Sequence, residues 1–343
     1  MVKFRIFPNF QKNAMLNAAN DSEFQSGGCI FMKSLSIIRQ SSAESIGLKP
    51  LWLKKLLGSW QLYLFVLPTL IYLALFQYAP MYGIQLAFKY YNPADGIWNS
   101  PWIGFENFER LFGSYYFLRL IRNTVFLNLY NLVVGFPFPI LLALIMNELR
   151  NEKFKKGVQT ALYAPHFVSV VVVVGILQCF FNTSNGLVNL TLKALGMEEV
   201  PFLASADIFP SLYVFSGLWQ NAGWNSIIYI AALAGVDPQL HEAAQIDGAS
   251  RFKRIIHINI PSLLPTATIL FILEAGKMMN VGFEKVFLMQ NAMNKETAEV
   301  ISTFVYTQGL VNMEYGFSTA VGLFNNVINI ALLLIFNAIS KKV

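Results

Sequence analysis

Two ionisable side chains lie inside an otherwise apolar run of this chain, where a charge is costly. Glu274 and Lys277 fall within the run from about 267 to 289, three positions apart on one helical face. A charge inside a membrane span is rare and by default indicates a role in binding or moving a solute. The alternative is that the two charges pair with each other, or that the span is shifted and they lie near its end.

A second group of polar and aromatic residues falls in the apolar run at 208–234. It comprises Trp219, Gln220, Asn221, Trp224 and Asn225. Aromatic faces and hydrogen-bonding amides suit a carbohydrate path, whereas packing between helices explains the same residues equally. The same two interpretations apply to Asn325, Asn326 and Asn329. The candidate substrate path therefore consists of Trp219, Gln220, Asn221, Asn225, Glu274 and Lys277.

The sequence holds no motif for catalysis. No GxxxxGK[ST] pattern occurs, because Gly276-Lys277 lacks both the upstream glycine and the following Ser or Thr. No GxSxG pattern is present, and the three histidines show no metal-ligand spacing. We expect no catalytic residue, no metal and no cofactor in this chain.

The polar segment 235–266 predicts two short helices joined by a tight turn. Asp237, followed by proline, is a good N-cap, and Ser250 can cap the second helix. Gly248 suits a helix C-terminus that needs a positive φ. The first helix presents a face of small residues that lets another surface approach closely, made by Leu240, Ala243 and Ala244.

The elements around these residues are predicted from composition. The chain of 343 residues is 55% hydrophobic and only 13% charged, whereas a soluble domain is about a quarter charged. Its apolar residues form runs of roughly 20, the length of a membrane-spanning helix. We expect an all-α polytopic membrane protein with six transmembrane helices. The runs lie at about 61–80, 123–146, 158–181, 208–234, 267–289 and 317–339.

Charge orients the predicted spans. Lys and Arg are concentrated in residues 1–58, in the turn 147–157, in 235–266 and at the C-terminal end. Cytoplasmic loops carry this excess, so both termini and the 235–266 loop are expected in the cytoplasm. The net charge of +6 is explained by these flanks, and we expect no nucleic-acid partner. The predicted organisation is a partly disordered leader at 1–58, then a six-span domain at 59–343.

The spacing within 235–266 resembles a family motif. Glu242-Ala243-Ala244, three residues, Gly248, nine residues, Ile258, one residue, Ile260 and Pro261 are similar to the EAA loop of bacterial binding-protein-dependent import permeases. Ile260 replaces the usual leucine, which conserves volume. The resemblance covers roughly 60–343. The first span and GFENFERLF resemble the oligosaccharide branch, the maltose-type permeases, and within it those for complex plant or acidic oligosaccharides.

The resemblance implies the permease subunit of an ATP-driven importer in the bacterial plasma (inner) membrane. An extracytoplasmic binding protein would deliver a solute, most readily an oligosaccharide, to this chain and a second permease subunit. Cytoplasmic ATPase subunits would hydrolyse ATP and receive the EAA loop. The residues that the family pattern assigns to this coupling are Glu242, Ala243, Ala244, Asp247, Gly248, Ile258 and Pro261.

Three alternatives stay open at this point. The permease could carry another solute class, because the loop pattern does not specify the solute. A secondary transporter would need coupling charges near the midplane and usually an internal repeat; only Glu274 and Lys277 qualify, and no repeat is evident. A membrane-embedded enzyme would need a convergent acid, base or metal cluster, which the sequence lacks.

Overall fold

The computed structural model describes residues 60–340, with side chains from 62 to 338. The predicted leader at 1–58 lies outside the described residues. Over the described range every regular element is a helix, as the sequence predicts, and an isolated antiparallel bridge joins Lys89 to Trp102. The chain divides after Leu73. The first part contributes α3 (Trp60–Leu73), an uncharged helix that contains Pro68.

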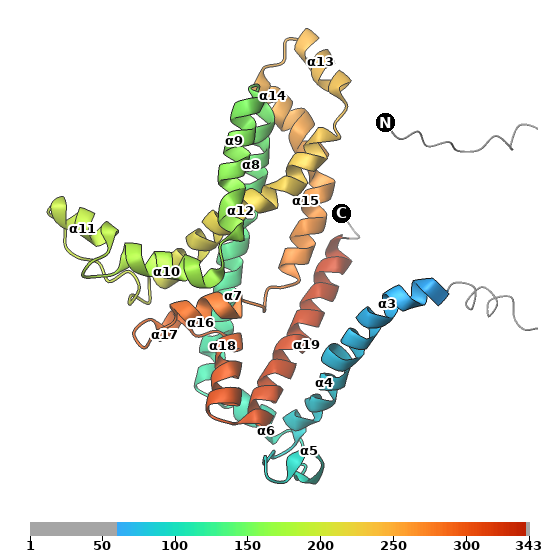
Figure 1. Cartoon of the computed structure of the whole chain (residues 1–343), viewed down its shortest axis with the longest axis vertical. Coiled ribbons are helices and arrows are strands. Elements are labelled where there is room, and N and C mark those ends of the chain that lie inside the picture. Colours follow the sequence, from blue (N-terminus) through green and yellow to red (C-terminus); the bar gives the residue numbers. More distant parts are fainter. Residues whose placement is uncertain (1–59, 341–343) are drawn as a thin grey trace, which may run out of the picture. The chain divides into compact units, whose positions relative to one another are not determined.

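The second part, from Ala74 onward, is an assembly of long and short helices (Figure 1). The long helices are α7 (Tyr116–Gly135), α8 (Pro137–Glu148), α9 (Glu152–Tyr163), α10 (Val170–Phe181), α12 (Phe209–Ala234), α15 (Ile260–Ala275) and α19 (Tyr315–Ser340). The short helices are α4 (Ala79–Met81), α5 (Gly96–Asn99), α6 (Glu106–Phe112), α11 (Leu187–Ala194), α13 (Pro238–Ile246), α14 (Arg251–Arg254), α16 (Phe283–Met289), α17 (Lys295–Ala298) and α18 (Ile301–Tyr306). Short π or 3₁₀ segments are η1 (Ala74–Tyr78), η2 (Tyr82–Phe88), η3 (Ala164–Phe167), η4 (Ile255–Asn259) and η5 (Thr307–Val311).

Several helical stretches are long and apolar enough to cross a membrane. Four pass on length and composition, namely Leu62–Phe88, Tyr116–Glu148, Arg251–Ala275 and Tyr315–Ala338. The pair Glu152–Phe167 and Val170–Phe181 makes a fifth if the two helices are counted as one span, although they meet at 99°. The 26-residue helix α12 coincides with the predicted fourth span but is not among the stretches that pass. The count of six therefore stays a prediction.

The structure corrects two predicted spans. The third, 158–181, is not a straight helix, because the chain bends between η3 and α10, just after Pro165. The fifth, 267–289, is wrong: the helical stretch starts at Arg251 and ends at Ala275. Two prolines do not interrupt this stretch: Pro261 lies in the first turn of α15, and Pro265 is accommodated within that helix.

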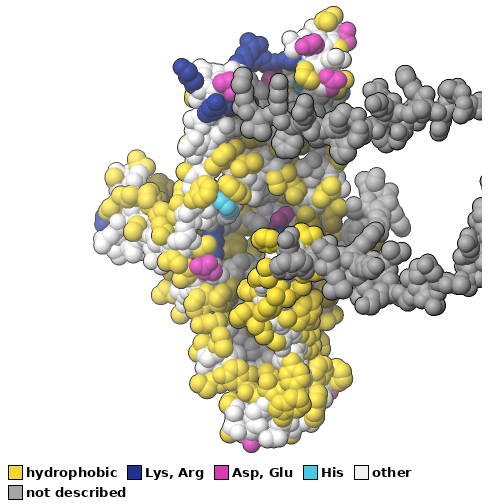
Figure 2. Space-filling model, turned by 45° about the vertical axis from the view of Figure 1, so that its right-hand side comes forward, with side chains coloured by type: hydrophobic (Ala, Val, Ile, Leu, Met, Phe, Trp, Pro, Cys, Tyr) yellow, Lys and Arg dark blue, Asp and Glu magenta, His cyan; other side chains and the backbone are white. Residues whose placement is uncertain are grey.

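Helix α12 lies at the centre of this part of the chain. It packs against α7, α8, α9 and α15. Gly223 allows α9 to approach α12 closely, because a Cβ there would lie 2.1 Å from the carbonyl oxygen of Leu162 on α9. Small residues serve this purpose in membrane proteins, where helices associate by close packing rather than by expulsion of water. The outer faces stay apolar, as Figure 2 shows over much of the surface.

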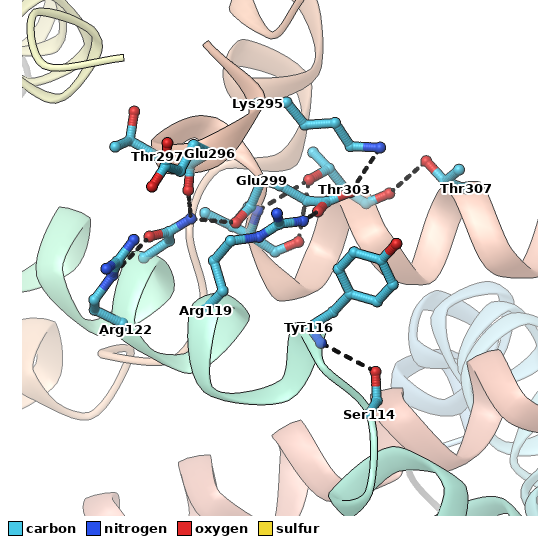
Figure 3. A network of polar contacts seen from close by, with 12 residues as sticks. Ser114, Tyr116, Arg119, Arg122, Lys295, Glu296, Thr297, Glu299, Thr303 and Thr307 are labelled. Atoms are coloured by element: carbon cyan, nitrogen blue, oxygen red, sulfur yellow. Dashed lines mark hydrogen bonds and ion pairs between the residues drawn. The ribbon is translucent and has the colours of Figure 1, made fainter. Parts of the chain in front are cut away.

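An ion-pair network fastens the connection between α15 and α19 to α7 (Figure 3). The Glu299 carboxylate is 3% exposed and pairs with both Arg119 on α7 and Lys295, the latter at 3.1 Å. The amide of Asn123 on α7 donates to the carbonyl oxygens of Glu296 and Glu299 at 2.7 and 3.0 Å. A carboxylate this buried is retained only when it is paired, so the network fixes α17 and α18 in register with α7.

Replacing the buried carboxylate tests this fastening. Glu299→Gln leaves the Arg119 guanidinium without its ion-pair partner, and we expect it to destabilise the fold by about 3 kcal/mol. The measurement is the thermal unfolding midpoint of the purified protein in detergent. Glu314→Gln is the control, because the side chains of the Arg110–Glu314 pair at 2.9 Å are 56% and 35% exposed, and loss of a pair this open to solvent should cost less than about 1 kcal/mol. Equal midpoints for the two variants would contradict the assigned role.

Candidate functional site

A cavity of about 510 Å³ opens between α7, α8, α10, α12, α15 and α16. Its wall is polar for a membrane protein. Amide side chains are supplied by Asn128, Asn131, Gln220, Asn221, Asn225 and Asn280. Charged and aromatic side chains are supplied by Glu274, Lys277, Lys285, Phe136, Tyr213 and Tyr229. Its size falls within the range of small-molecule sites, and its mixed lining can bind a solute rich in hydroxyl groups.

Interrupted helices border the cavity on several sides. Between α7 and α8 the chain passes through Phe136 into Pro137, and Gly135, Phe136 and Pro139 line the wall. After α15 the chain turns through Gly276, and Lys277, Met278 and Asn280 line the opposite part. Irregular backbone at membrane depth is tolerated where it is buried in protein or lines a cavity.

Five of the six predicted path residues line this cavity: Gln220, Asn221, Asn225, Glu274 and Lys277. Trp219 does not line it and is half exposed. Consecutive helical residues are turned by about 100°, so Trp219 projects about 200° away from Asn221 around α12. Trp224 is likewise outside the wall and stacks on His166, with ring centroids 4.5 Å apart.

The predicted amides are used in different ways. Gln220 is buried, and its Nε2 donates to the carbonyl oxygen of Val168 at 2.8 Å, inside the bend between η3 and α10. Asn221 donates to Gly217 and contacts the His166 ring nitrogen at 3.0 Å. Asn225 has no side-chain hydrogen bond to any other residue that the structure describes. Its amide therefore stays available to a solute, whereas Gln220 serves packing.

The two predicted charges lie at the end of a span. The Lys277 ammonium donates to the Glu274 carboxylate at 3.2 Å, and both side chains are more than half exposed. Since α15 ends at Ala275, both charges sit where the helix meets the cavity. The two charges thus pair with each other and lie near the end of a span, the two alternatives to a solute-binding role that were considered from the sequence. Both side chains also line the cavity, so they can still contact a solute.

Sequence reasoning missed several lining residues, Lys285 above all. Lys285 is 8% exposed and lines the cavity from α16. It falls within the predicted run 267–289, so the rule that singles out Glu274 and Lys277 also applies to it. Asn131, Tyr213 and Tyr229 carry no comparable signal, because polar residues on an apolar helix are common at packed interfaces.

The segment 235–266 folds largely as predicted. The Asp237 side chain accepts from the backbone N–H of Gln239 at 2.9 Å and so caps α13. Gly248 has a φ of +74°, and Ser250 accepts from the N–H of Lys253 at the start of α14. From Arg251 the helix continues through η4 into α15 without a gap. The second predicted helix is therefore the beginning of a long helix.

The residues of the predicted coupling motif gather at one end of the molecule. Glu242, Ala243, Asp247 and Gly248 are exposed on α13 and the turn after it, while Ile258 and Pro261 lie farther along, in η4 and α15. Apolar side chains accompany them, with Ile246 at 87% and Phe252 at 70% exposure. Figure 1 shows α13 and α14 at the same end as the start of α9, and Figure 2 shows Lys and Arg gathered there. Exposed apolar residues rimmed by charge are typical of a protein interface.

Comparison with known proteins defines the class. Residues 135–343 match the family described as binding-protein-dependent transport system inner membrane component. This match covers more than half of the chain and includes most of the cavity wall and the α13–α14 segment. The chain belongs to this family. It is a polytopic inner-membrane permease of an ABC importer.

Individual members of the family are similar to this chain over most of its length. The chain is 44% identical over 288 residues to the polygalacturonan/rhamnogalacturonan transport system permease protein YteP of Bacillus subtilis, covering 84% of this chain and 90% of the relative. It is 42% identical over 291 residues to protein LplB of the same organism, covering 85% and 92%. A bacterial ABC transporter involved in the import of the acidic polysaccharide alginate superposes with a TM-score of 0.79 at 41% identity, covering 85% of this chain and 99% of that one.

A substitution of Gln220 tests its packing role. Gln220→Leu removes the donor from the partly buried carbonyl group of Val168, and we expect it to lower stability by about 1–3 kcal/mol. The thermal unfolding midpoint in detergent measures this loss. Gln178→Leu on α10 is the control, because that side chain is exposed. If Gln220→Leu unfolds like the wild type, the carbonyl is satisfied in another way and the packing role is wrong.

Proposed function

We propose that this permease forms the path for an oligosaccharide delivered by an extracytoplasmic binding protein. The observation that carries the proposal is the cavity itself, in which Asn131, Asn225 and Asn280 make no side-chain hydrogen bond to another described residue. Free amides and aromatic rings are the groups that bind sugar hydroxyls and sugar faces. The names of relatives that transport polygalacturonan, rhamnogalacturonan or arabinooligosaccharides support the same solute class.

The proposed partners occupy opposite ends of the molecule. Cytoplasmic ATPase subunits would receive α13, whose Glu242 is free for a basic partner and whose Ala243 and Ala244 permit close approach. A binding protein and a second permease subunit complete the assembly. The related alginate transporter has been solved with an alginate pentasaccharide-bound periplasmic protein, which supports the binding-protein part. Lipid covers the apolar outer faces, and nucleic acid is not a partner.

The proposal extends to the energy source of transport and to the orientation of the chain in the membrane. We propose that this chain carries no cofactor and no catalytic centre, and that ATP is hydrolysed by the partner subunits, since no phosphate-binding motif occurs in the sequence. Both termini would lie in the cytoplasm with α13, in keeping with the basic residues at that end. Six spans would result if α12 and the bent pair each cross the membrane once.

The coupling loop is tested by co-purification from the native membrane. Glu242→Lys reverses the exposed charge on α13. Gly248→Pro cannot adopt the φ of +74° and loses the N–H donated to Gln245 at 3.1 Å. We expect the co-purified ATPase to fall at least about tenfold with either variant, since each loses interface contacts worth more than about 1.4 kcal/mol.

Matched variants make this result specific. Glu152→Lys makes the same charge change at the same end of the molecule but outside the loop, and it should retain the ATPase. Gly248→Asn tolerates a positive φ and should also retain most of it. If the wild type purifies without any ATPase under gentle conditions, the proposed coupling is wrong. If the wild type does bring its partners with it, the ligand of the co-purified binding protein identifies the solute.

A further inference from the structure

Lys285 is the one buried ammonium group in the cavity wall. It extends from α16 toward α12, where its Nζ donates to the carbonyl oxygen of Tyr213 at 2.8 Å. The same Nζ lies 4.8 Å from the centroid of the Tyr213 ring. These contacts hold the ammonium at a fixed position beside the cavity, because a cation is attracted both to a carbonyl oxygen and to an aromatic face.

No carboxylate compensates this charge within the described residues. The ion pairs found there do not include Lys285. The carboxylate that lines the same cavity, Glu274, already pairs with Lys277. Charges removed from water are normally paired or bound to a ligand, because desolvation of an isolated ion is expensive. The cavity therefore keeps one positive charge in excess.

The surroundings of Lys285 leave room and donors for a ligand. An ammonium group has three N–H donors, of which one is used by the Tyr213 carbonyl. Gly217 on α12 also lines the cavity, and a Cβ there would lie 3.1 Å from the Lys285 Nζ. A glycine at this position lets the ammonium lie close to α12 while both residues line the cavity. Asn221, one turn farther along α12, lines the adjoining part of the wall.

We propose that Lys285 binds a carboxylate of the solute, so that the cavity selects oligosaccharides built from sugar acids over neutral ones. This inference rests on the proposed oligosaccharide function and names the chemical class of its solute. The solute carboxylate supplies the counter-charge for Lys285 that no described residue of the protein provides. A neutral sugar leaves the buried ammonium uncompensated, and a charged hydrogen bond is lost as well.

Uptake of two matched sugars tests the proposal. The complete importer, purified from its native membrane with its own binding protein, is reconstituted into ATP-loaded proteoliposomes. The probes are trigalacturonate and its methyl ester, which differ in charge but hardly in shape. The binding protein is the same in every assay, so its own preference cancels when variants are compared by their acid-to-ester uptake ratio. ATPase activity without sugar reports assembly of each variant.

Three substitutions of Lys285 and one control are informative. Lys285→Gln and Lys285→Met should each lower the acid-to-ester ratio by about tenfold or more, the loss of one charged hydrogen bond. Lys285→Met fills the site with an apolar chain of similar length, so a folding defect of one variant does not decide the outcome. Lys285→Arg should retain most of the ratio. Lys193→Gln removes an exposed lysine outside the cavity and should leave the ratio unchanged.

The outcomes separate this inference from the proposed function. If both sugars enter and neither neutral variant changes the ratio, the carboxylate site is wrong while the oligosaccharide path stands. An equal loss of both sugars in the neutral variants makes Lys285 structural and also overturns the site. If the wild-type complex takes up neither sugar although its ATPase is active, the selection for sugar acids is wrong, and the oligosaccharide path fails as well only if the ligand of the co-purified binding protein is not a sugar.

Discussion

The need to satisfy backbone polar groups away from water governs this structure. In hydrocarbon each unpaired N–H or C=O group costs several kcal/mol, so a helix can be interrupted only where other protein groups replace its lost bonds. The Gln220 amide does so for Val168 at the bend before α10, and the Asn128 amide donates to Met278 in the turn after α15 at 2.8 Å. In the same turn the N–H of Met279 donates to Asn329.

These side-chain bonds explain why the cavity exists where it does. Each interruption re-aims the chain and leaves space between helices that would otherwise pack closely. Where no interruption is present, contact is tight, as at Gly223 against Leu162. The amides that line the cavity therefore fall into two groups. Some hydrogen-bond to backbone groups where a helix is interrupted, and others, such as Asn225, are available to a ligand. Composition alone cannot distinguish the two, since both require the same residue type.

The parts of the fold governed by local chemistry could be predicted from the sequence. The caps at Asp237 and Ser250 and the positive φ of Gly248 depend only on neighbouring residues, and the structure shows all three. The start of the fifth span was misplaced because the basic residues from Arg251 onward indicate a short surface helix, whereas the helix runs on through η4 into α15, with Pro261 in its first turn and Pro265 inside it. Arg119, the ion-pair partner of Glu299 on α7, lies 180 residues away along the chain, and no local pattern in the sequence specifies such a pairing.

A single long helix joins the exposed segment around α13 to the cavity wall. The helical stretch Arg251–Ala275 begins three residues after Gly248 and ends just past Glu274, which lies on the wall of the cavity. Its 25 residues span about 37 Å, so a tilt at one end displaces the other. Coupling free energy between two sites is reciprocal. If a partner bound at α13 changes the affinity of the cavity for its solute by some factor, the solute changes the affinity of that partner by the same factor.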